Sequence, residues 1–259
     1  MIDRTVTDFR IYNDGNDFSL ASRTIAESYS CDEMLQSTSL CRSLTRDGHY
    51  FSVDLPEDNS VSVRVLQGPM TQQEQDEWVG RISWKLDLAC GELGISSALL
   101  MFQDETYDDP DAYQFIKVPS GLYQVDVYSY LPSSTFVAQD LLTQLTSQAY
   151  FVPVGQWFRE TRSGEEYPNW VIWECLESFD GDPDNEEYWA QVQAEMDDDQ
   201  VETLQEQAGK YVEFLIHLTP LSTEPPFPGF ISSGCLQWTG RLPEKCPYGL
   251  YSEDIESDR

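Results

Sequence analysis

The chain of 259 residues carries 46 carboxylates against 15 lysines and arginines, which gives a formal net charge of −31 at pH 7. A charge this negative repels nucleic acid and anionic membranes, and it attracts cations or basic protein surfaces. Disordered acidic chains are poor in aromatic residues, whereas aromatics make up 13% of this chain, so we expect a folded protein with a sizeable core.

Strand patterns dominate the first half of the chain. Apolar and polar residues alternate at 61–65, 82–88 and 123–127, and the alternation returns at 212–218. A period of two is typical of half-buried strands in antiparallel sheets, which place one face on a core and one in water. The sequence therefore predicts a mainly β fold, an antiparallel β-sandwich or open barrel with a short acidic helical insertion.

Turn residues separate three pairs of apolar runs, at 55–60, 90–91 and 119–121. Proline, asparagine and glycine supply the backbone geometry of tight reversals, so the sequence predicts three hairpins. The first and third hairpins resemble each other at a spacing of about 63 residues. Two explanations fit this likeness: an internal duplication of a small β unit, or two ordinary hairpins with the same turn chemistry.

Helix signals are fewer. Thr71 followed by Glu74 is the pattern of a capping box and predicts a helix at 70–78, and a second helix is predicted at 138–148. Apolar residues at helical spacing predict two more, at 185–196 and 198–208. Strands predicted at 170–176 and 211–218 flank an acidic helical insertion at 180–208. We expect one large domain over residues 1–259, with a division into two lobes near 132–137 as the alternative.

The acidic charge is concentrated in one segment. No basic residue lies between Arg162 and Lys210, and the 47 residues between them carry fifteen carboxylates. A run of aspartates, 197–199, supplies an N-cap and favourable charge to the helix that follows. Six apolar side chains should tie the segment to a core, so that the acid lies on a positioned surface: Tyr188, Trp189, Val192, Met196, Val201 and Leu204. The alternative is a plain acidic protein whose charge serves solubility or salt adaptation.

We expect this acidic surface to engage a basic protein surface by electrostatic steering. The function that fits is a non-enzymatic binding protein, such as an inhibitor or immunity protein. It would mimic nucleic acid and occupy the phosphate-binding site of a nucleic-acid-binding enzyme. Direct binding of nucleic acid or membrane is not expected. The residues assigned to partner binding are Asp180, Asp182, Asp184, Glu195, Asp197, Asp198, Asp199, Glu202 and Glu206.

The start of the insertion also resembles part of a calcium loop, with three aspartates at alternate positions from 180. Position 12 of that loop is Gln191 instead of a bidentate glutamate, which argues against an EF-hand. A looser calcium site stays open as a second hypothesis, with an acidic capping turn as the simpler explanation. A second acidic loop at 104–111 would join the site if the two loops were neighbours. The candidate metal ligands are Asp180, Asp182, Asp184, Glu186 and Glu187.

Signatures of catalysis are weak, and no cofactor other than calcium is indicated. Gly-x-Ser-x-Gly, Ser-x-x-Lys and P-loop motifs are absent, and the chain has only two histidines, His49 and His217. Cys235 and Cys246 are either a metal clamp, a redox pair or small buried side chains. A third hypothesis is a carbohydrate-active β-sandwich module. Its stacking platform would use Trp157, Trp170 and Trp173, although alternation suggests that they pack in the core.

The N-terminal residues contain no apolar segment typical of a signal peptide. The apolar run at 98–102 is far shorter than the ~20 residues of a membrane helix. We therefore expect a cytoplasmic protein with reduced cysteines. The sequence does not indicate the partner's identity or the oligomeric state.

Overall fold

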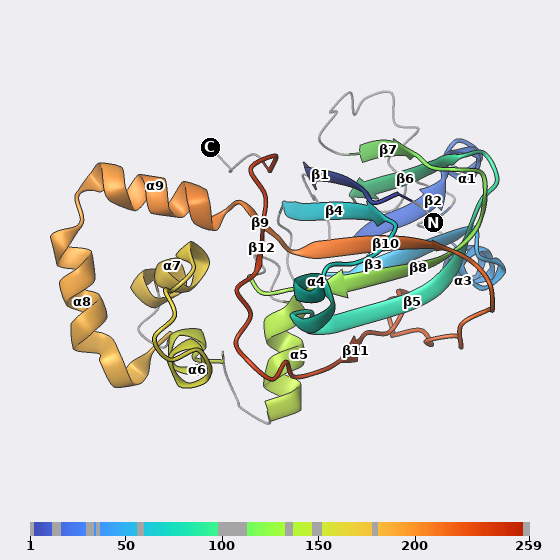
Figure 1. Cartoon of the computed structure of the whole chain (residues 1–259). Helices are drawn as coiled ribbons and strands as arrows, with labels where there is room; N and C mark the ends of the chain where they lie inside the picture. The colour runs from blue at the N-terminus through green and yellow to red at the C-terminus, as the bar shows by residue number, and fades with distance from the viewer. Residues whose placement is uncertain are drawn as a thin grey trace.

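Figure 1 shows the computed structural model, which describes residues 3–11, 17–29, 34, 37–55, 60–97, 113–132, 137–146, 152–177 and 181–255. In this part of the chain the strands form two larger sheets and a two-stranded ribbon. The helices between residues 154 and 208 gather to one side of the sheets. The fold is therefore mixed α/β: the predicted antiparallel sheets are present, but the helical content is too large for a mainly β fold. Within the described ranges no helix has the length and apolar composition needed to span a bilayer.

Six strands form the larger sheet, in the order β1 (Thr5–Ile11), β4 (Val61–Gln67), β10 (Phe214–Pro220), β8 (Gly121–Ser129), β5 (Gly80–Leu88) and β11 (Thr239–Gly240). Neighbouring strands are antiparallel except β4 and β10, which run parallel. The sheet is thus mixed, and the expectation of purely antiparallel pairing is wrong at this one pair. The described strands form no closed barrel.

Four strands form the second sheet, in the order β3 (Tyr50–Asp54), β2 (Asp17–Ser22), β6 (Glu92–Ser97) and β7 (Tyr113–Lys117), all antiparallel. The two larger sheets bury side chains in one common core. Every second residue of β5, from Ile82 to Leu88, is buried as the alternation predicts. These side chains belong to the same apolar cluster as Leu20 of β2 and Phe51 of β3. Burial of each such side chain stabilises the fold by about 1.5–3 kcal/mol.

The three turns predicted as hairpins join strands of different sheets. β3 is followed by β4, β5 by β6, and β7 by β8, and each of these pairs is split between the two larger sheets. The hairpin prediction is therefore wrong, although the strands on either side of each turn are correctly placed. Turn residues determine where a chain reverses, whereas pairing partners are decided by which faces can be buried together.

The strand order of both sheets is mirrored about a centre. From β1 in the larger sheet the chain crosses to the second sheet, forms the pair β2–β3 there and returns to the larger sheet as β4. The next four strands repeat this path: β5 and β8 lie in the larger sheet, and β6 and β7 pair in the second. β10 lies between the two halves of the larger sheet, and β2 meets β6 in the middle of the second sheet. This is the arrangement expected of a repeated four-strand unit, so the topology favours the duplication over two chance hairpins.

The helices divide into two groups along the chain. Among the strands lie α1 (Arg23–Ala26), α3 (Thr38–Asp47) and α4 (Gln72–Asp76). Both hydrogen bonds of the capping box predicted at Thr71 and Glu74 are present at the start of α4. Between β8 and the ribbon strand β9 (Tyr211–Val212), which pairs with β12 (Leu250–Tyr251), lie α5 (Val137–Thr146), α6 (Val154–Thr161), α7 (Asn169–Glu177), η2 (Pro183–Asn185), α8 (Glu186–Glu195) and α9 (Asp198–Ala208).

Residues 170–176, predicted as a strand, belong to helix α7. Periodicity alone cannot assign an apolar run this short to a strand or a helix. Trp170, Val171 and Cys175 are buried, and these positions lie on one side of a helix. Nε1 of Trp170 donates a hydrogen bond to the backbone oxygen of Tyr248 at 2.7 Å. The helical part of the chain is consequently larger than the predicted insertion, because α5, α6 and α7 precede it.

Candidate protein-binding surface

Helix α9 begins at a capping box. The carboxylate of Asp197 accepts a hydrogen bond from the backbone N–H of Gln200 at 2.9 Å, and Oε1 of Gln200 accepts one from the N–H of Asp197 at 3.0 Å. Asp198 and Asp199 follow in the first turn, where the helix dipole favours negative charge. The capping bonds fix the start of α9 with one aspartate, and the other two remain available on the surface.

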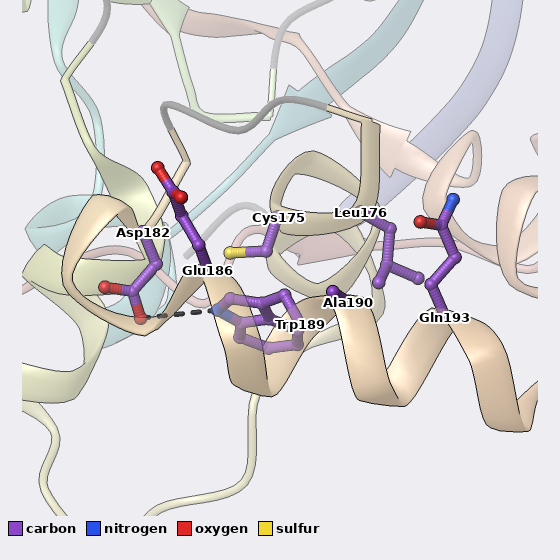
Figure 2. Close-up of a pocket in the computed structure, with 7 residues that line it drawn as sticks. All are labelled: Cys175, Leu176, Asp182, Glu186, Trp189, Ala190 and Gln193. Carbon is purple, nitrogen blue, oxygen red and sulfur yellow. Dashed lines mark hydrogen bonds between the residues drawn. The ribbon is translucent and has the colours of Figure 1, made fainter.

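Asp182 fixes the start of η2 and α8. Its side chain is fully buried, and its Oδ1 lies 2.9 Å from Nη2 of Arg159 on α6. Its Oδ2 accepts hydrogen bonds from Nδ2 of Asn185 at 3.1 Å and from Nε1 of Trp189 at 3.3 Å, the latter drawn in Figure 2. The expectation that Asp182 is an exposed carboxylate is wrong, because Arg159 and the following turn already take up its charge and hydrogen-bonding capacity.

A small cavity lies beside this buried carboxylate, between α7 and α8 (Figure 2). Cys175 and Leu176 line it from α7, and Trp189 and Gln193 line it from α8. Its volume is 20 Å³, close to the ~10–15 Å³ that one water molecule needs. Burial raises the pKa of Cys175 to about 12, so this thiol stays protonated and is not an activated nucleophile. The cavity is therefore a packing feature and not a ligand site.

Apolar and amide contacts hold α8 and α9 against the helices before them. Trp189 is buried, and its ring centroid lies 5.3 Å from that of Tyr167. Leu204 of α9 is also buried, and Nδ2 of Asn169 on α7 donates to Oε1 of Gln207 on α9 at 2.6 Å. The prediction that Trp189 and Leu204 are tied to a core is confirmed, so the acidic helices have a fixed position.

Tyr188 departs from that prediction. Its side chain is 53% exposed, and its ring lies edge-on against that of Trp189 at a centroid distance of 5.0 Å. Neighbouring positions on a helix point about 100° apart, so when Trp189 enters the core Tyr188 is turned outward. Exposed tyrosines held by packing are frequent interface anchors. The exposure of Tyr188 is not predictable from the helical spacing, because that spacing groups it with the apolar residues that face the core.

The carboxylates of α8 and α9 are exposed and form no ion pair in the described part of the chain. Within the described residues, none between Glu186 and Glu206 forms an ion pair, and Asp184 reaches Arg159 only at 3.9 Å. Of the residues assigned to partner binding, Asp180 lies outside the described ranges. The exposed carboxylates of this surface, here called the acidic face, are Asp184, Glu186, Glu187, Glu195, Asp197, Asp198, Asp199, Glu202 and Glu206.

One stripe of the acidic face repeats like charges at helical spacing. Asp198, Glu202 and Glu206 are separated by four residues each, which puts them on the same side of α9 about 6 Å apart along its axis. Each like-charged pair at this spacing destabilises a helix by about 0.2–0.5 kcal/mol. Glu206 also lies in the last turn, where the helix dipole disfavours an anion. Lys210, just beyond the helix, is close enough to feel the charge of Glu206, but it forms its ion pair with Glu253 at 3.1 Å.

Carboxylates of the larger sheet are treated differently. Asp8 on β1 lies 2.6 Å from Nη2 of Arg64, and Asp126 on β8 lies 2.7 Å from Nη2 of Arg81. Charge compensation is thus uneven: these sheet carboxylates have close arginine partners, whereas the described part of the acidic face forms only the long contact between Asp184 and Arg159. A charge that served only solubility would not require such segregation.

The calcium hypothesis gains no support from the geometry. Asp180 and the loop 104–111 lie outside the described ranges, so part of the predicted ligand set cannot be placed. Asp182, the central ligand of the pattern, is bonded to Arg159. In the described part of the chain no three His, Cys, Asp or Glu side chains are grouped closely enough to hold a metal ion.

Several of the residues considered for catalysis or sugar stacking are buried or hydrogen-bonded to the backbone. Cys235 and Cys246 are both buried as free thiols; burial raises the pKa of Cys235 to about 11 and that of Cys246 further still. Nε2 of His217 lies 2.7 Å from the backbone oxygen of Gly68. Trp170 is buried, which confirms its assignment to the core, while Trp157 and Trp173 are half-buried.

Comparisons with known proteins give two weak structural likenesses. No protein-family model and no curated protein matches the chain. A structure described as "Crocagin biosynthetic gene J" is 12% identical, covers 85% of this chain and 99% of its own, and has a TM-score of 0.37. ComJ from Bacillus subtilis, described as an inhibitor of the DNA degrading activity of NucA, is 8% identical, covers 50% and 85%, and has a TM-score of 0.33. Likeness at this level establishes neither a family nor a function.

Proposed function

We propose that this chain is a binding protein whose acidic face docks onto a basic protein surface, and that it thereby inhibits a nucleic-acid-binding enzyme such as a nuclease. The two larger sheets, taken as the layers of a β-sandwich, would serve as the scaffold that positions the helices. The single observation that supports the proposal most is the set of exposed carboxylates on α8 and α9 that form no ion pair within the described residues.

Inhibition follows from competition for one surface. An enzyme that holds nucleic acid presents lysines and arginines to the phosphates. A rigid face of carboxylates fits the same cations, and Tyr188 at its edge supplies an apolar contact that bulk anions lack. Complementary charge accelerates encounter and selects partners, and the association rate falls as salt screens it. In the complex, the partner's basic groups would neutralise the repulsion among Asp198, Glu202 and Glu206 on α9.

A degradation assay tests the proposal directly. The full chain is added to a panel of purified nucleases with basic substrate-binding surfaces, and DNA degradation and direct association are measured at several salt concentrations. We expect stoichiometric inhibition of at least one of them, with an association rate that falls steeply as salt rises. Replacement of the stripe (Asp198→Asn, Glu202→Gln, Glu206→Gln) should weaken binding at least tenfold.

A matched variant shows whether binding depends on where the three charges lie or only on the net charge of the chain. Asp3→Asn, Asp140→Asn and Glu244→Gln remove the same three charges from exposed positions outside the acidic face, and binding should change less than twofold. If both triple variants bind equally, or if the chain inhibits none of the basic nucleases, the proposal fails. A rise in melting temperature with millimolar Ca²⁺ that EDTA removes would instead support the calcium hypothesis.

A further inference from the structure

Another cavity lies at the other end of the molecule. Its volume is 250 Å³, and it is enclosed by α3, the strands β2 and β3, and the loop around residue 234. Figure 1 places α3 at the opposite end of the molecule from α8 and α9, so the cavity is separate from the acidic face. The residues that carry the argument are Asp17, Met34, Tyr50, Ser52, Asp54 and Ser233.

Two carboxylates face this cavity from directly opposed positions. Asp17 on β2 and Asp54 on β3 are cross-strand partners in the antiparallel register. Like charges directly opposite each other destabilise a sheet. Neither residue forms an ion pair within the described residues, and the flanking segments 12–16 and 56–59 contain no lysine or arginine in the sequence. The fold therefore brings two acids together and supplies no cation of its own to separate them.

Hydroxyl groups hold this pair in place and leave part of each carboxylate uncommitted. The Ser52 hydroxyl donates to Oδ2 of Asp17, and the Ser233 hydroxyl donates to Oδ1 of Asp54 at 3.0 Å. The sulfhydryl of Cys235 donates in turn to the Ser52 hydroxyl at 3.4 Å. Burial raises the pKa of Asp17. The hydrogen bond from Ser52 opposes this rise, and the charge of Asp54 adds to it. A positive charge placed between the two carboxylates would relieve both the repulsion and the cost of burial.

The lining narrows the chemical class of the occupant. An anion is disfavoured by the two acids. Cys41 and Cys235 also line the cavity, but among the described residues no three His, Cys, Asp or Glu side chains are grouped closely enough to hold a metal ion. The volume of 250 Å³ is below the ~300–1,000 Å³ typical of drug-sized ligands, so the occupant is small. Met34 and Tyr50 are buried and contribute an apolar and an aromatic wall, and an aromatic ring attracts organic cations.

We propose that this cavity binds a small organic ammonium ion, with the ammonium group between Asp17 and Asp54 and the alkyl part against Met34 and Tyr50. The proposed activity of the acidic face does not depend on it. Ammonium groups donate three hydrogen bonds, which suits two carboxylates and a serine hydroxyl. Recognition would be selective for amines over alcohols of the same size, because only the charged group stabilises the opposed acids.

Calorimetric titration of the full chain with butylammonium chloride at pH 7.5, beside titration with butanol, tests this site. We expect saturable one-to-one binding of the amine and at least tenfold weaker binding of the alcohol. Asp54→Asn should weaken amine binding at least tenfold, while Asp198→Asn, which removes the same charge from the acidic face, should change it less than twofold. Methyl NMR of Met34 should report the amine in the wild-type protein and in Asp198→Asn.

Each alternative outcome is decisive. Equal loss of binding in Asp54→Asn and Asp198→Asn would identify diffuse counter-ion binding and overturn the proposal, as would equal affinity for amine and alcohol. If Asp54→Asn destabilises the fold, Ser233→Ala offers a milder change at the same carboxylate, with an expected loss of about threefold. An unmoved Met34 signal at saturating amine would also refute the site.

Discussion

Nη2 of Arg159 on α6 lies 2.9 Å from the fully buried Oδ1 of Asp182, ahead of α8. Replacing Arg159 by methionine would leave that carboxylate buried without its cation, which typically costs about 1–3 kcal/mol. We expect urea unfolding followed by circular dichroism to show a loss of this size. The double variant Arg159→Met/Asp182→Asn should recover part of it, because the uncompensated charge is gone. Equal losses in the two variants would mean that the pair does not hold the turn.

Glu174 on α7 gives the helical region a pH dependence. Burial, with a smaller contribution from Glu177, raises its pKa from 4.5 to about 7. Because the folded pKa lies above the unfolded one, the contribution to stability is fully present below pH 4.5 and is lost as pH rises through 7. Glu174→Gln should therefore be more stable than the wild type at pH 8, by up to about 3 kcal/mol, and nearly equal to it at pH 4.5. Thermal unfolding across pH 4.5–8 measures the difference; a gain that is the same at every pH would contradict this origin.

The stripe on α9 predicts a conflict between stability and binding. Glu206→Lys converts a repulsive pair with Glu202 into an attractive one and places a cation in the last turn of the helix. These gains are partly offset because the attraction between Glu206 and Lys210 is lost. We expect a gain of about 0.5–1 kcal/mol at low salt, measured by thermal unfolding, that shrinks at high salt. The same variant should inhibit the partner enzyme less well. Glu244→Lys, an equal charge change outside the helices, provides the control and should alter neither quantity appreciably.

Tyr188 should matter for association and not for folding. It is 53% exposed, and truncating a surface side chain usually changes stability by less than about 0.5 kcal/mol. In the inhibition assay Tyr188→Ala should weaken binding at least tenfold, chiefly by faster dissociation, because the lost contact is short-range. Unlike the stripe variant, it should leave the salt dependence of association unchanged. A normal affinity in Tyr188→Ala would restrict the interface to its charges.

The sequence predicted the strands better than their partners. Alternation at 82–88 and 61–65 identified β5 and β4 because it records which side chains are buried. Pairing was missed because a turn such as Cys90-Gly91 looks the same whether the chain returns to its own sheet or crosses to another. The prediction of a strand at 170–176 is wrong because a run of seven mostly apolar residues contains too little periodicity to distinguish a helix such as α7 from a strand.

The acidic face was predicted in outline, and its two exceptions have a common cause. The carboxylate of Asp182 was expected on the surface and is buried, whereas the ring of Tyr188 was expected in the core and is exposed. A sequence shows the polarity of each side chain. It does not show that Arg159, 23 residues earlier, contacts Asp182 and so offsets the free-energy cost of burying its charge. That meeting depends on how α6 approaches the turn before α8, which is a tertiary relationship.

The position of β10 has a consequence for how the chain can be made. β10 fills the centre of the larger sheet but is synthesised after all four helices from α6 to α9. Until residues 214–220 leave the ribosome, β4 and β8 each present an unpaired edge, and such edges accept strands from other chains. The gap between β4 and β8 therefore stays open while residues 130–213 are synthesised, about a third of the chain, and a release or pause before residue 214 would leave a species prone to aggregate.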